Sequence, residues 1–422
     1  MTNKDMLGRS CVVTREEALR RILEHAAVPS PAHESIPISS SLGRIVAVEV
    51  ISPSELPAFA RSTMDGYAVR SADTFGAGES LPALLNVIGD IPMGVIPDRA
   101  IEKGEIMKIA TGGALPEGAD AVVMLEHTHA VDERTIEITR PAGPIEHVVQ
   151  PGDDLKKGEV ILSRGHRMRP QDMAALASVG VTTIDVFARP KGAVISTGNE
   201  LVPADASPAP GRIRDSNSYN LEGLILQSGG IPVRKGIISD DEDLLRTTVK
   251  DALKDCCLVL ITGGSSVGAA DHTAKVVESF GPPGVLVHGV SMRPGKPLIA
   301  GWAGTVPIFG LPGHPVAVAV SFEVFVRPVL ARLTGEITLP VLEGISAYRV
   351  VRANLARSIS SGPGREDHVR VFLEKRDGEL WAVPVRGGSG LISTLVKAVG
   401  TVVVPLGTIG IEAGDEVEVR LF

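Results

Sequence analysis

The stretch from Leu258 to Asp271, LVLITGGSSVGAAD, constrains the fold of this chain more than any other part of the sequence. Its first four residues are apolar and rich in β-branched side chains, which indicates a fully buried strand. A glycine-rich loop follows, and the apolar spacing from Ala274 to Phe280 predicts a helix that ends at Gly281. This order is typical of an open parallel α/β sheet, which binds its ligands at the carboxyl ends of the strands.

The loop exposes backbone N–H groups ahead of a helix N-terminus, so we expect it to bind an anion through Gly263, Gly264, Ser266 and Gly268. It is not a P-loop, because alanines stand where Lys and Ser or Thr are required. The segment 264–268 also fits the G-x-S-x-G nucleophile elbow, which would make Ser266 the nucleophile of a hydrolase. A plain turn, whose glycines supply positive φ, is the third interpretation of the same residues.

Four predicted strands each end in a polar loop rich in Gly or Pro, at residues 197–200, 263–271, 293–297 and 310–315. The carboxyl ends of parallel strands meet at one edge of a sheet, so we expect these loops to gather there. Carboxylates beside cations and free N–H groups suit Mg²⁺ bound together with a phosphorylated substrate. The carboxylates are Glu200, Asp215, Asp240 and Asp271, and the cations are Arg293 and Lys296.

Local signals predict the other elements. Thr14 begins a helix through a capping box with Glu17, and Asp240 is expected to cap a helix with an acidic first turn. Residues 45–50 indicate a strand. Short strands with frequent turns predict a small β domain from Leu81 to Val149, and a second β domain or barrel in the tail, 340–422.

Two polar groups in or near the small β domain have alternative interpretations. Asp65 precedes Gly66 and is either a turn former or part of a ligand site with Ser62. His127 and His129 alternate on a predicted strand, where they form either a metal-binding pair or a solvated face.

The composition excludes several classes of function. A net charge of −8 and 3% aromatic residues oppose binding to phosphate backbones and stacking on bases, so we expect no nucleic-acid partner. Three cysteines, two of them adjacent, give neither a disulfide framework nor a C-x-x-C metal site. No long apolar run indicates a leader or a membrane span, so we expect a cytoplasmic protein without membrane contact.

Motifs in the same order along nearly the whole chain resemble the molybdopterin molybdenumtransferase family, which includes bacterial MoeA and the animal gephyrin E domain. They are S-x-M-D-G-Y-A at Ser62–Ala68, P-E-G-A-D-A-V-V at Pro116–Val123 after the T-G turn at Thr111, G-x-D at Gly152–Asp154, S-T-G-x-E-L at Ser196–Leu201, R-D-S-N at Arg214–Asn217, T-G-G-x-S-V-G-x-x-D at Thr262–Asp271, P-G-K-P at Pro294–Pro297 and G-L-P-G-x-P at Gly310–Pro315.

The resemblance implies an enzyme of molybdenum cofactor biosynthesis. Its reaction inserts molybdenum from molybdate into adenylylated molybdopterin, depends on Mg²⁺ and releases AMP. The resemblance places six residues in the catalytic cleft: Asp65, Thr111, Asp154, Glu200, Asp240 and Asp271. Among these, Asp271, Glu200 and Asp240 would bind the metal. Substrate contacts would come from Ser62, Asp215, Asn217, Arg293, Lys296, Pro312 and Pro315, together with the glycine loop.

The resemblance also implies an α/β multidomain fold with four domains. Residues 1–52 and 152–187 would form a discontinuous N-terminal helical and extended domain, with the small β domain 53–151 inserted in it. An open, mostly parallel α/β molybdopterin-binding domain would span 188–334, and a C-terminal β-barrel domain 335–422. The expected assembly is a homodimer. Molybdopterin adenylyltransferase and molybdoenzyme apoproteins are further expected partners.

Some residues depart from the family pattern: Asn199, Ser265, Arg293 and His314 stand where Asp, an apolar residue, Lys and Asn are common. The sequence does not distinguish molybdate from tungstate as substrate. Two alternative functions stay open: a serine hydrolase that uses Ser266 with a histidine such as His314, and a non-catalytic scaffold of the gephyrin type.

Overall fold

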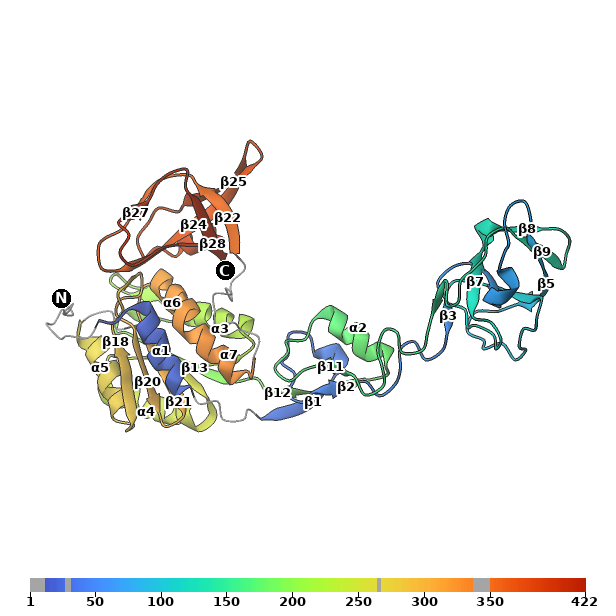
Figure 1. The fold of residues 1–422 in the computed structure, drawn as a ribbon. Helices are drawn as coiled ribbons and strands as arrows, with labels where there is room; N and C mark the ends of the chain where they lie inside the picture. Colours follow the sequence, from blue (N-terminus) through green and yellow to red (C-terminus); the bar gives the residue numbers. More distant parts are fainter. Residues whose placement is uncertain (1–11, 27–31, 264–266, 337–349) are drawn as a thin grey trace.

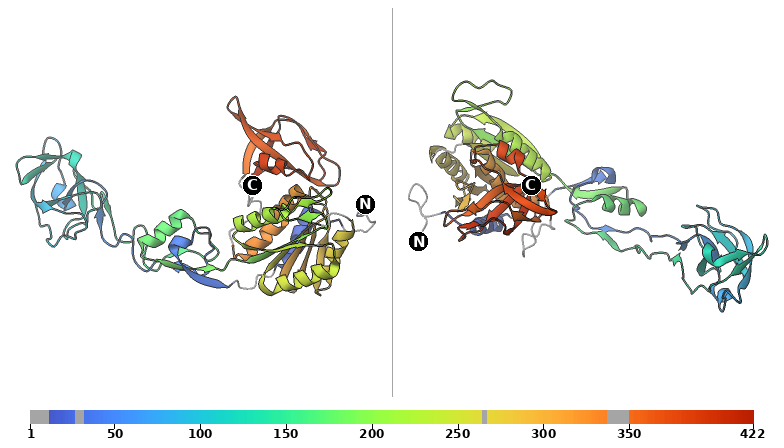
Figure 2. Two further views of the ribbon diagram at one scale, coloured as in Figure 1. Left: turned by 180° about the vertical axis from the view of Figure 1, so that it is seen from behind. Right: turned by 90° about the horizontal axis from the view of Figure 1, so that it is seen from above.

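The molecule is elongated, as the computed structural model in Figure 1 shows. The structure describes residues 12–26, 32–263, 267–336 and 350–422, without the side chains of residues 267–271. An α/β domain carries a β-barrel on one side; a small middle domain and then a β domain extend away from it, in the views of Figure 2 as well.

The α/β domain is built on a six-stranded sheet in the order β16-β13-β17-β21-β20-β18. The first four strands of this order are parallel, as predicted. β20 is antiparallel to both neighbours, so β18 points the same way as those four. The carboxyl ends of five strands therefore meet at one edge. The strands are β13 (Lys191–Thr197), β16 (Ile231–Ile238), β17 (Leu258–Gly263), β18 (Pro283–His288), β20 (Ile299–Ala303) and β21 (Val306–Leu311).

Helices cover both faces of this sheet because its strand residues are apolar on both sides. Val194 and Leu260 point to a core shared with α1, α3, α6 and α7, whereas Ala193 and Ile261 point to a core shared with α4 and α5. None of the described helices is long and apolar enough to cross a bilayer. The helices are α1 (Arg15–His25), α3 (Asn217–Gln227), α4 (Glu242–Asp255), α5 (Val267–Glu278), α6 (Pro315–Ser321) and α7 (Arg327–Leu333).

Several details differ from the sequence predictions. The N-cap of α4 is Asp241, whose side chain accepts from Leu244 N, and not Asp240. The helix predicted to run on from residue 315 is broken by a π turn, η4 (Phe322–Val326). Although Thr14 caps α1 as expected, the helix packs on the α/β sheet rather than in the domain to which residues 1–52 were assigned.

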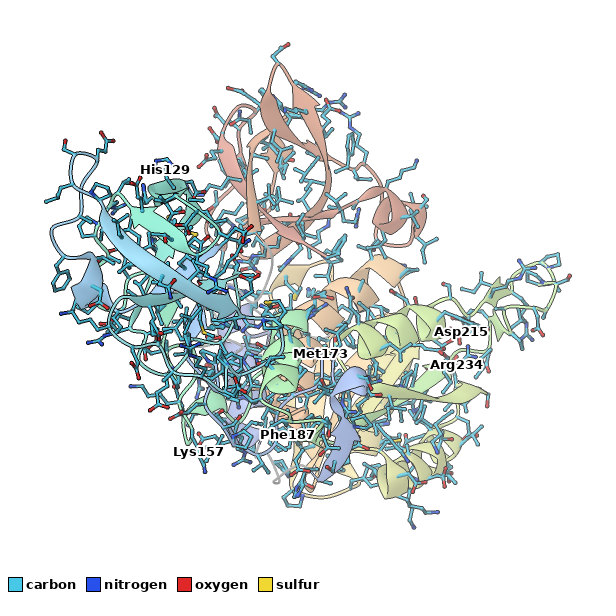
Figure 3. The ribbon with its side chains drawn as sticks, turned by 90° about the vertical axis from the view of Figure 1, so that its right-hand side faces the viewer. His129, Lys157, Met173, Phe187, Asp215 and Arg234 are labelled. Atoms are coloured by element: carbon cyan, nitrogen blue, oxygen red, sulfur yellow. The ribbon has the colours of Figure 1, made fainter. Side chains whose placement is uncertain are left out.

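The middle domain packs α2 (Pro170–Ser178) against two short antiparallel pairs, β1 with β12 and β2 with β11. The predicted strand at residues 45–50 is wrong in extent: Ile45 and Val46 form only isolated bridges, and the strand proper is β2. Arg164 covers the ring of Phe187, labelled in Figure 3, at 5.3 Å. The strands are β1 (His33–Pro37), β2 (Val50–Ile51), β11 (Val160–Leu162) and β12 (Thr183–Phe187).

The β domain is a six-stranded sheet in the order β7-β4-β6-β5-β9-β8, with a separate cluster of buried residues around Val69 and another around Met107. His127 lies in a 3₁₀ turn, η3 (Leu125–His127), and only His129 is on a strand, so the alternation predicted for this pair is wrong. The strands of the sheet are β4 (Gly66–Val69), β5 (Ala83–Asp90), β6 (Glu105–Ile109), β7 (Ala121–Met124), β8 (Thr128–Ala130) and β9 (Thr135–Ile138). A separate antiparallel pair joins β3 (Arg61–Ser62) to β10 (Val148–Val149).

The C-terminal domain is a closed barrel, because β24 pairs with both β25 and β26 and completes the ring β24-β25-β22-β28-β26. A short strand of the preceding domain, β19 (Met292–Arg293), adds to β24 in parallel and joins the two domains. The barrel strands are β22 (Val350–Leu355), β24 (Glu366–Arg376), β25 (Glu379–Pro384), β26 (Gly400–Val404) and β28 (Glu416–Leu421), with α8 (Ser393–Lys397) between β25 and β26.

Candidate functional site

Glycines shape the carboxyl edge of the α/β sheet. Gly263 ends β17 with φ +121°, and a Cβ there would lie 1.8 Å from the carbonyl oxygen of Thr197. Gly198 (φ +152°) directly follows β13, and a Cβ on it would lie 2.7 Å from Oε2 of the Glu200 side chain. The contact at Gly263 is with backbone, so only glycine allows it there. The backbones of β13 and β17 therefore approach each other closely at this edge, and the Glu200 carboxylate folds back over Gly198.

Asp215 and Asn217 hold this edge together from inside. The Asp215 carboxylate is 7% exposed, and it accepts from Ser196 Oγ at 2.7 Å and from Ser218 N at 3.1 Å. Asn217 donates from Nδ2 to Thr262 Oγ1 at 3.2 Å and to the carbonyl oxygen of Gly313 at 2.8 Å. These two of the polar side chains predicted to contact substrate are thus engaged within the α/β domain, where Figure 3 labels Asp215.

Two of the three proposed metal ligands lie in loops that contact each other. Asn199 N donates to Asp240 Oδ2 at 3.4 Å, and Asp240 N donates to Asn199 Oδ1 at 3.3 Å. Glu200 and Asp240 take part in no ion pair among the described residues. Within that same part of the chain, no three His, Cys, Asp or Glu side chains are close enough to hold a metal.

The centre of the predicted anion loop lies largely outside the described residues. Gly264 and Ser266 are not described. Gly268 and Asp271 belong to the first turns of α5, and the side chain of Asp271 is not described either. The helix itself follows β17 as predicted, so its N-terminus faces the sheet edge.

The cations lie in the P-G-K-P loop and directly before it, on β19. Arg293 and Lys296 are both exposed, and neither forms an ion pair in the part of the chain that is described. Gly295 has φ +117°, and a Cβ on it would lie 2.9 Å from the buried hydroxyl of Ser321. The loop therefore rests directly on the last residue of α6 and presents its charges outward.

The barrel supplies a loop that the sequence reading missed. Ser389 Oγ lies 2.9 Å from Nδ1 of His314, and the Ser389 carbonyl accepts from Val316 N at 3.2 Å. The first contact is with His314, in the loop that contains buried Pro312, and the second is with Val316, which follows Pro315 at the start of α6. The signal was the G-G-S-G run at 387–390 after a strand. In this arrangement His314, the histidine offered as an example for the hydrolase interpretation, is engaged by Ser389.

The remaining predicted residues lie in the β and middle domains. Asp65 is exposed and accepts from Thr111 N at 2.7 Å and from Thr111 Oγ1 at 3.0 Å, and these bonds lower the pKa of Asp65 below its usual value. Ser62 is buried and donates to the Met64 carbonyl at 2.6 Å. Asp154 is exposed in the loop after β10.

The predicted site residues do not all come together within one chain. β4, which follows Asp65 directly, and the α/β sheet lie in opposite end parts of the molecule in both views of Figure 2. The structure therefore contains two separate groups of site residues, which we call the sheet edge (Glu200, Asp240, Arg293, Lys296 and the loops around them) and the β-domain site (Asp65 and Thr111).

Comparisons with known proteins agree along the chain. Residues 13–180 match the MoeA N-terminal region (domain I and II), 193–332 a probable molybdopterin binding domain, and 352–422 the MoeA C-terminal region (domain IV). A putative molybdopterin biosynthesis protein from Methanocaldococcus jannaschii is 38% identical over 92% of each chain. The molybdopterin molybdenumtransferase of Bacillus subtilis is 32% identical over 99% of this chain and 95% of its own.

Solved structures give the same result. A molybdopterin biosynthesis MoeA protein from Pyrococcus horikoshii superposes with a TM-score of 0.84 at 31% identity, covering 97% of this chain and all of the other. A second structure of that description has a TM-score of 0.80 at 38% identity, with 97% and 99% coverage.

Proposed function

Because the chain belongs to the MoeA family, we propose that it inserts molybdenum from molybdate into adenylylated molybdopterin and releases AMP. By its membership of this family the protein is a molybdopterin molybdenumtransferase of molybdenum cofactor biosynthesis. The observation that carries the proposal is the sheet edge, where Glu200 and Asp240 lie at the same end of the sheet as the exposed cations of Arg293 and Lys296. A phosphoanhydride and an oxyanion are both anionic, so this edge suits them.

The cations and the glycine loop would bind the anionic groups. Lys296 acts as a point charge, whereas the Arg293 guanidinium favours bidentate contact with oxyanions. The N-terminus of α5 would add its N–H groups and its partial positive charge. At the sheet edge, substrate binding would thus fall to the backbone and two side chains.

A Mg²⁺ ion would be held by Glu200, Asp240 and Asp271. The two described carboxylates fit it, since Mg²⁺ prefers hard oxygen ligands and neither group is neutralised by an ion pair among the described residues. The third ligand would come from Asp271 in the first turns of α5. The ion would offset phosphate charge at the edge.

The two separated groups of site residues support a homodimer. If the β-domain site of one protomer faces the sheet edge of its partner, two-fold symmetry gives two complete clefts. Asp65 and Thr111 then act on substrate held by the other chain. Molybdopterin adenylyltransferase would supply the substrate and molybdoenzyme apoproteins would take the product, all in the cytoplasm.

One incubation tests the function. The protein is mixed with adenylylated molybdopterin, molybdate and Mg²⁺, and AMP and molybdenum cofactor are followed together. We expect both to appear in equal amounts, and omission of molybdate to prevent cofactor formation. No AMP release would support a scaffold. Covalent labelling by a fluorophosphonate, with loss of activity, would support the hydrolase instead.

A further inference from the structure

The base of the P-G-K-P loop is held between two other segments of the chain. On one side, Ser291 N donates to the Val13 carbonyl at 2.8 Å, and Val13 N donates to the Gly289 carbonyl at 3.3 Å. On the other side, β19 pairs with β24, and Glu366 N donates to the Ser291 carbonyl at 2.9 Å. The position of Arg293 and Lys296 therefore depends on the segment before α1 and on the first residues of β24.

A buried carboxylate connects these two flanking segments. Glu366, the first residue of β24, is 6% exposed. Its Oε2 accepts from Arg15 Nε at 3.1 Å, and Oε1 lies 2.7 Å from Nε2 of the buried His368. Arg15 begins α1, two residues after Val13. The ion pair thus closes a bracket around the base of the loop, with Val13 and Arg15 on one arm and Glu366 on the other.

Further charged groups surround this bracket. The π turn η4 brings buried Glu323, paired with Arg327 at 2.7 Å, towards the barrel. A cavity of about 20 Å³ between η4 and the barrel is lined by Glu323, His368, Thr401 and Arg420, among other residues. Burial raises the pKa of Glu366, but His368, Arg15 and Arg420 outweigh burial and hold that pKa below its usual value. The Glu366 carboxylate is therefore ionised at neutral pH, and its negative charge attracts Arg15 of α1 and interacts with His368 of β24.

We propose that Glu366 is a positioning residue for substrate binding: through Arg15 and the β19–β24 pairing it holds the P-G-K-P loop where Lys296 meets the anionic substrate. This rests on the proposed function of Lys296. Glu366 itself touches no substrate. Its role differs from fold stabilisation, because the barrel and the α/β domain each keep their own core of buried residues.

The test compares Glu366→Gln, Lys296→Ala and the double variant. The amide keeps the size of Glu366 but removes the charge that attracts Arg15. For Glu366→Gln we expect KM for adenylylated molybdopterin to rise about tenfold while kcat stays within about twofold. The reason is that the variant weakens binding of the substrate and of the transition state equally. In the Lys296→Ala background the same change should raise KM by less than about twofold, because both act through one contact.

Asp172→Asn is the matched control, because Asp172 is also a buried carboxylate with a histidine and an arginine, His166 and Arg169, but lies in the middle domain. It should leave KM unchanged. If Lys296→Ala does not raise KM, the proposed function of the loop fails. If Lys296→Ala raises KM and Glu366→Gln does not, or if the two effects multiply in the double variant, the positioning role is overturned. Should Glu366→Gln not fold, Arg15→Gln decides by the same criteria, since Arg15 is 25% exposed.

Discussion

The sheet edge and the β-domain site present polar groups in opposite ways. At the sheet edge, the strand ends are held by contacts inside the protein: Asp215 with Ser196, and Asn217 with Thr262. At the β-domain site, Asp65 is exposed, and its carboxylate accepts hydrogen bonds from Thr111 of a neighbouring turn and from no other described residue. The edge therefore depends on the packing of the whole domain, whereas the β-domain site depends on one local contact. Substitutions at the sheet edge should therefore lower stability, whereas substitutions at the β-domain site should lower activity with little change in stability.

Gly263→Ala should have the largest effect on stability. The added Cβ would lie 1.8 Å from the Thr197 carbonyl oxygen, and neither β13 nor β17 can move without disturbing a buried core. We expect a loss of about 3 kcal/mol or more in the free energy of unfolding, measured with urea.

Gly211→Ala is the control for this prediction. Gly211 also has positive φ, at +84°, but nothing lies within 4 Å of its Cβ position. It should cost about 1 kcal/mol from backbone conformation alone. Equal losses for the two variants would show that the close approach at the sheet edge contributes nothing.

Asp65→Ala should separate activity from stability. The carboxylate is exposed, so the free energy of unfolding should change little, whereas AMP release should fall about a hundredfold or more if Asp65 acts on the substrate. Asp132→Ala is the control: this carboxylate of the same domain is exposed and likewise accepts from nearby backbone N–H groups, of Arg134 and Thr135. Equal activity of the two variants would remove Asp65 from the site.

Buried carboxylates with a lowered pKa should contribute more to the pH dependence of stability than exposed ones. Arg169 and His166 overcome the burial of Asp172 and lower its pKa to about 2, whereas the lowered pKa of Asp65 belongs to an exposed group. A carboxyl with a lowered folded pKa stabilises the protein above its unfolded pKa, and this contribution disappears as the pH falls. Asp172 should thus contribute about 2 kcal/mol at neutral pH, lost between about pH 4 and pH 2.

Urea unfolding measured at steps between pH 5 and pH 2 checks this. Asp172→Asn should be less stable at neutral pH and should lose less stability than the wild type on acidification. Asp65→Asn should change the slope less than Asp172→Asn does, because solvent screens the contribution of an exposed carboxylate. A wild-type slope in Asp172→Asn would contradict the assignment.

How much the sequence predicted depends on how local the signal is. The buried run Leu258–Ile261 and the glycines after it are a local signal, and β17, α5 and the common edge of the parallel strands follow from it. Asp240 and Asp241 are adjacent and equally suited to capping, so only the observed bond to Leu244 N distinguishes them. The docking of α1 on the sheet and the contact between His314 and Ser389 join residues far apart in sequence, which periodicity does not encode.

The last prediction tests whether the two groups of site residues belong to one cleft. Asp65→Ala and Asp271→Ala should each be inactive as pure proteins, because every cleft then lacks one group. After mixing and subunit exchange, a dimer of one chain of each kind contains one cleft with both substitutions and one with neither. Free exchange makes about half of the dimers mixed, so activity should recover to about a quarter of the wild type. Mass spectrometry confirms the exchange independently. If exchange is complete and activity does not return, each cleft is built from a single chain, and the β domain of that chain must then swing towards its own sheet edge.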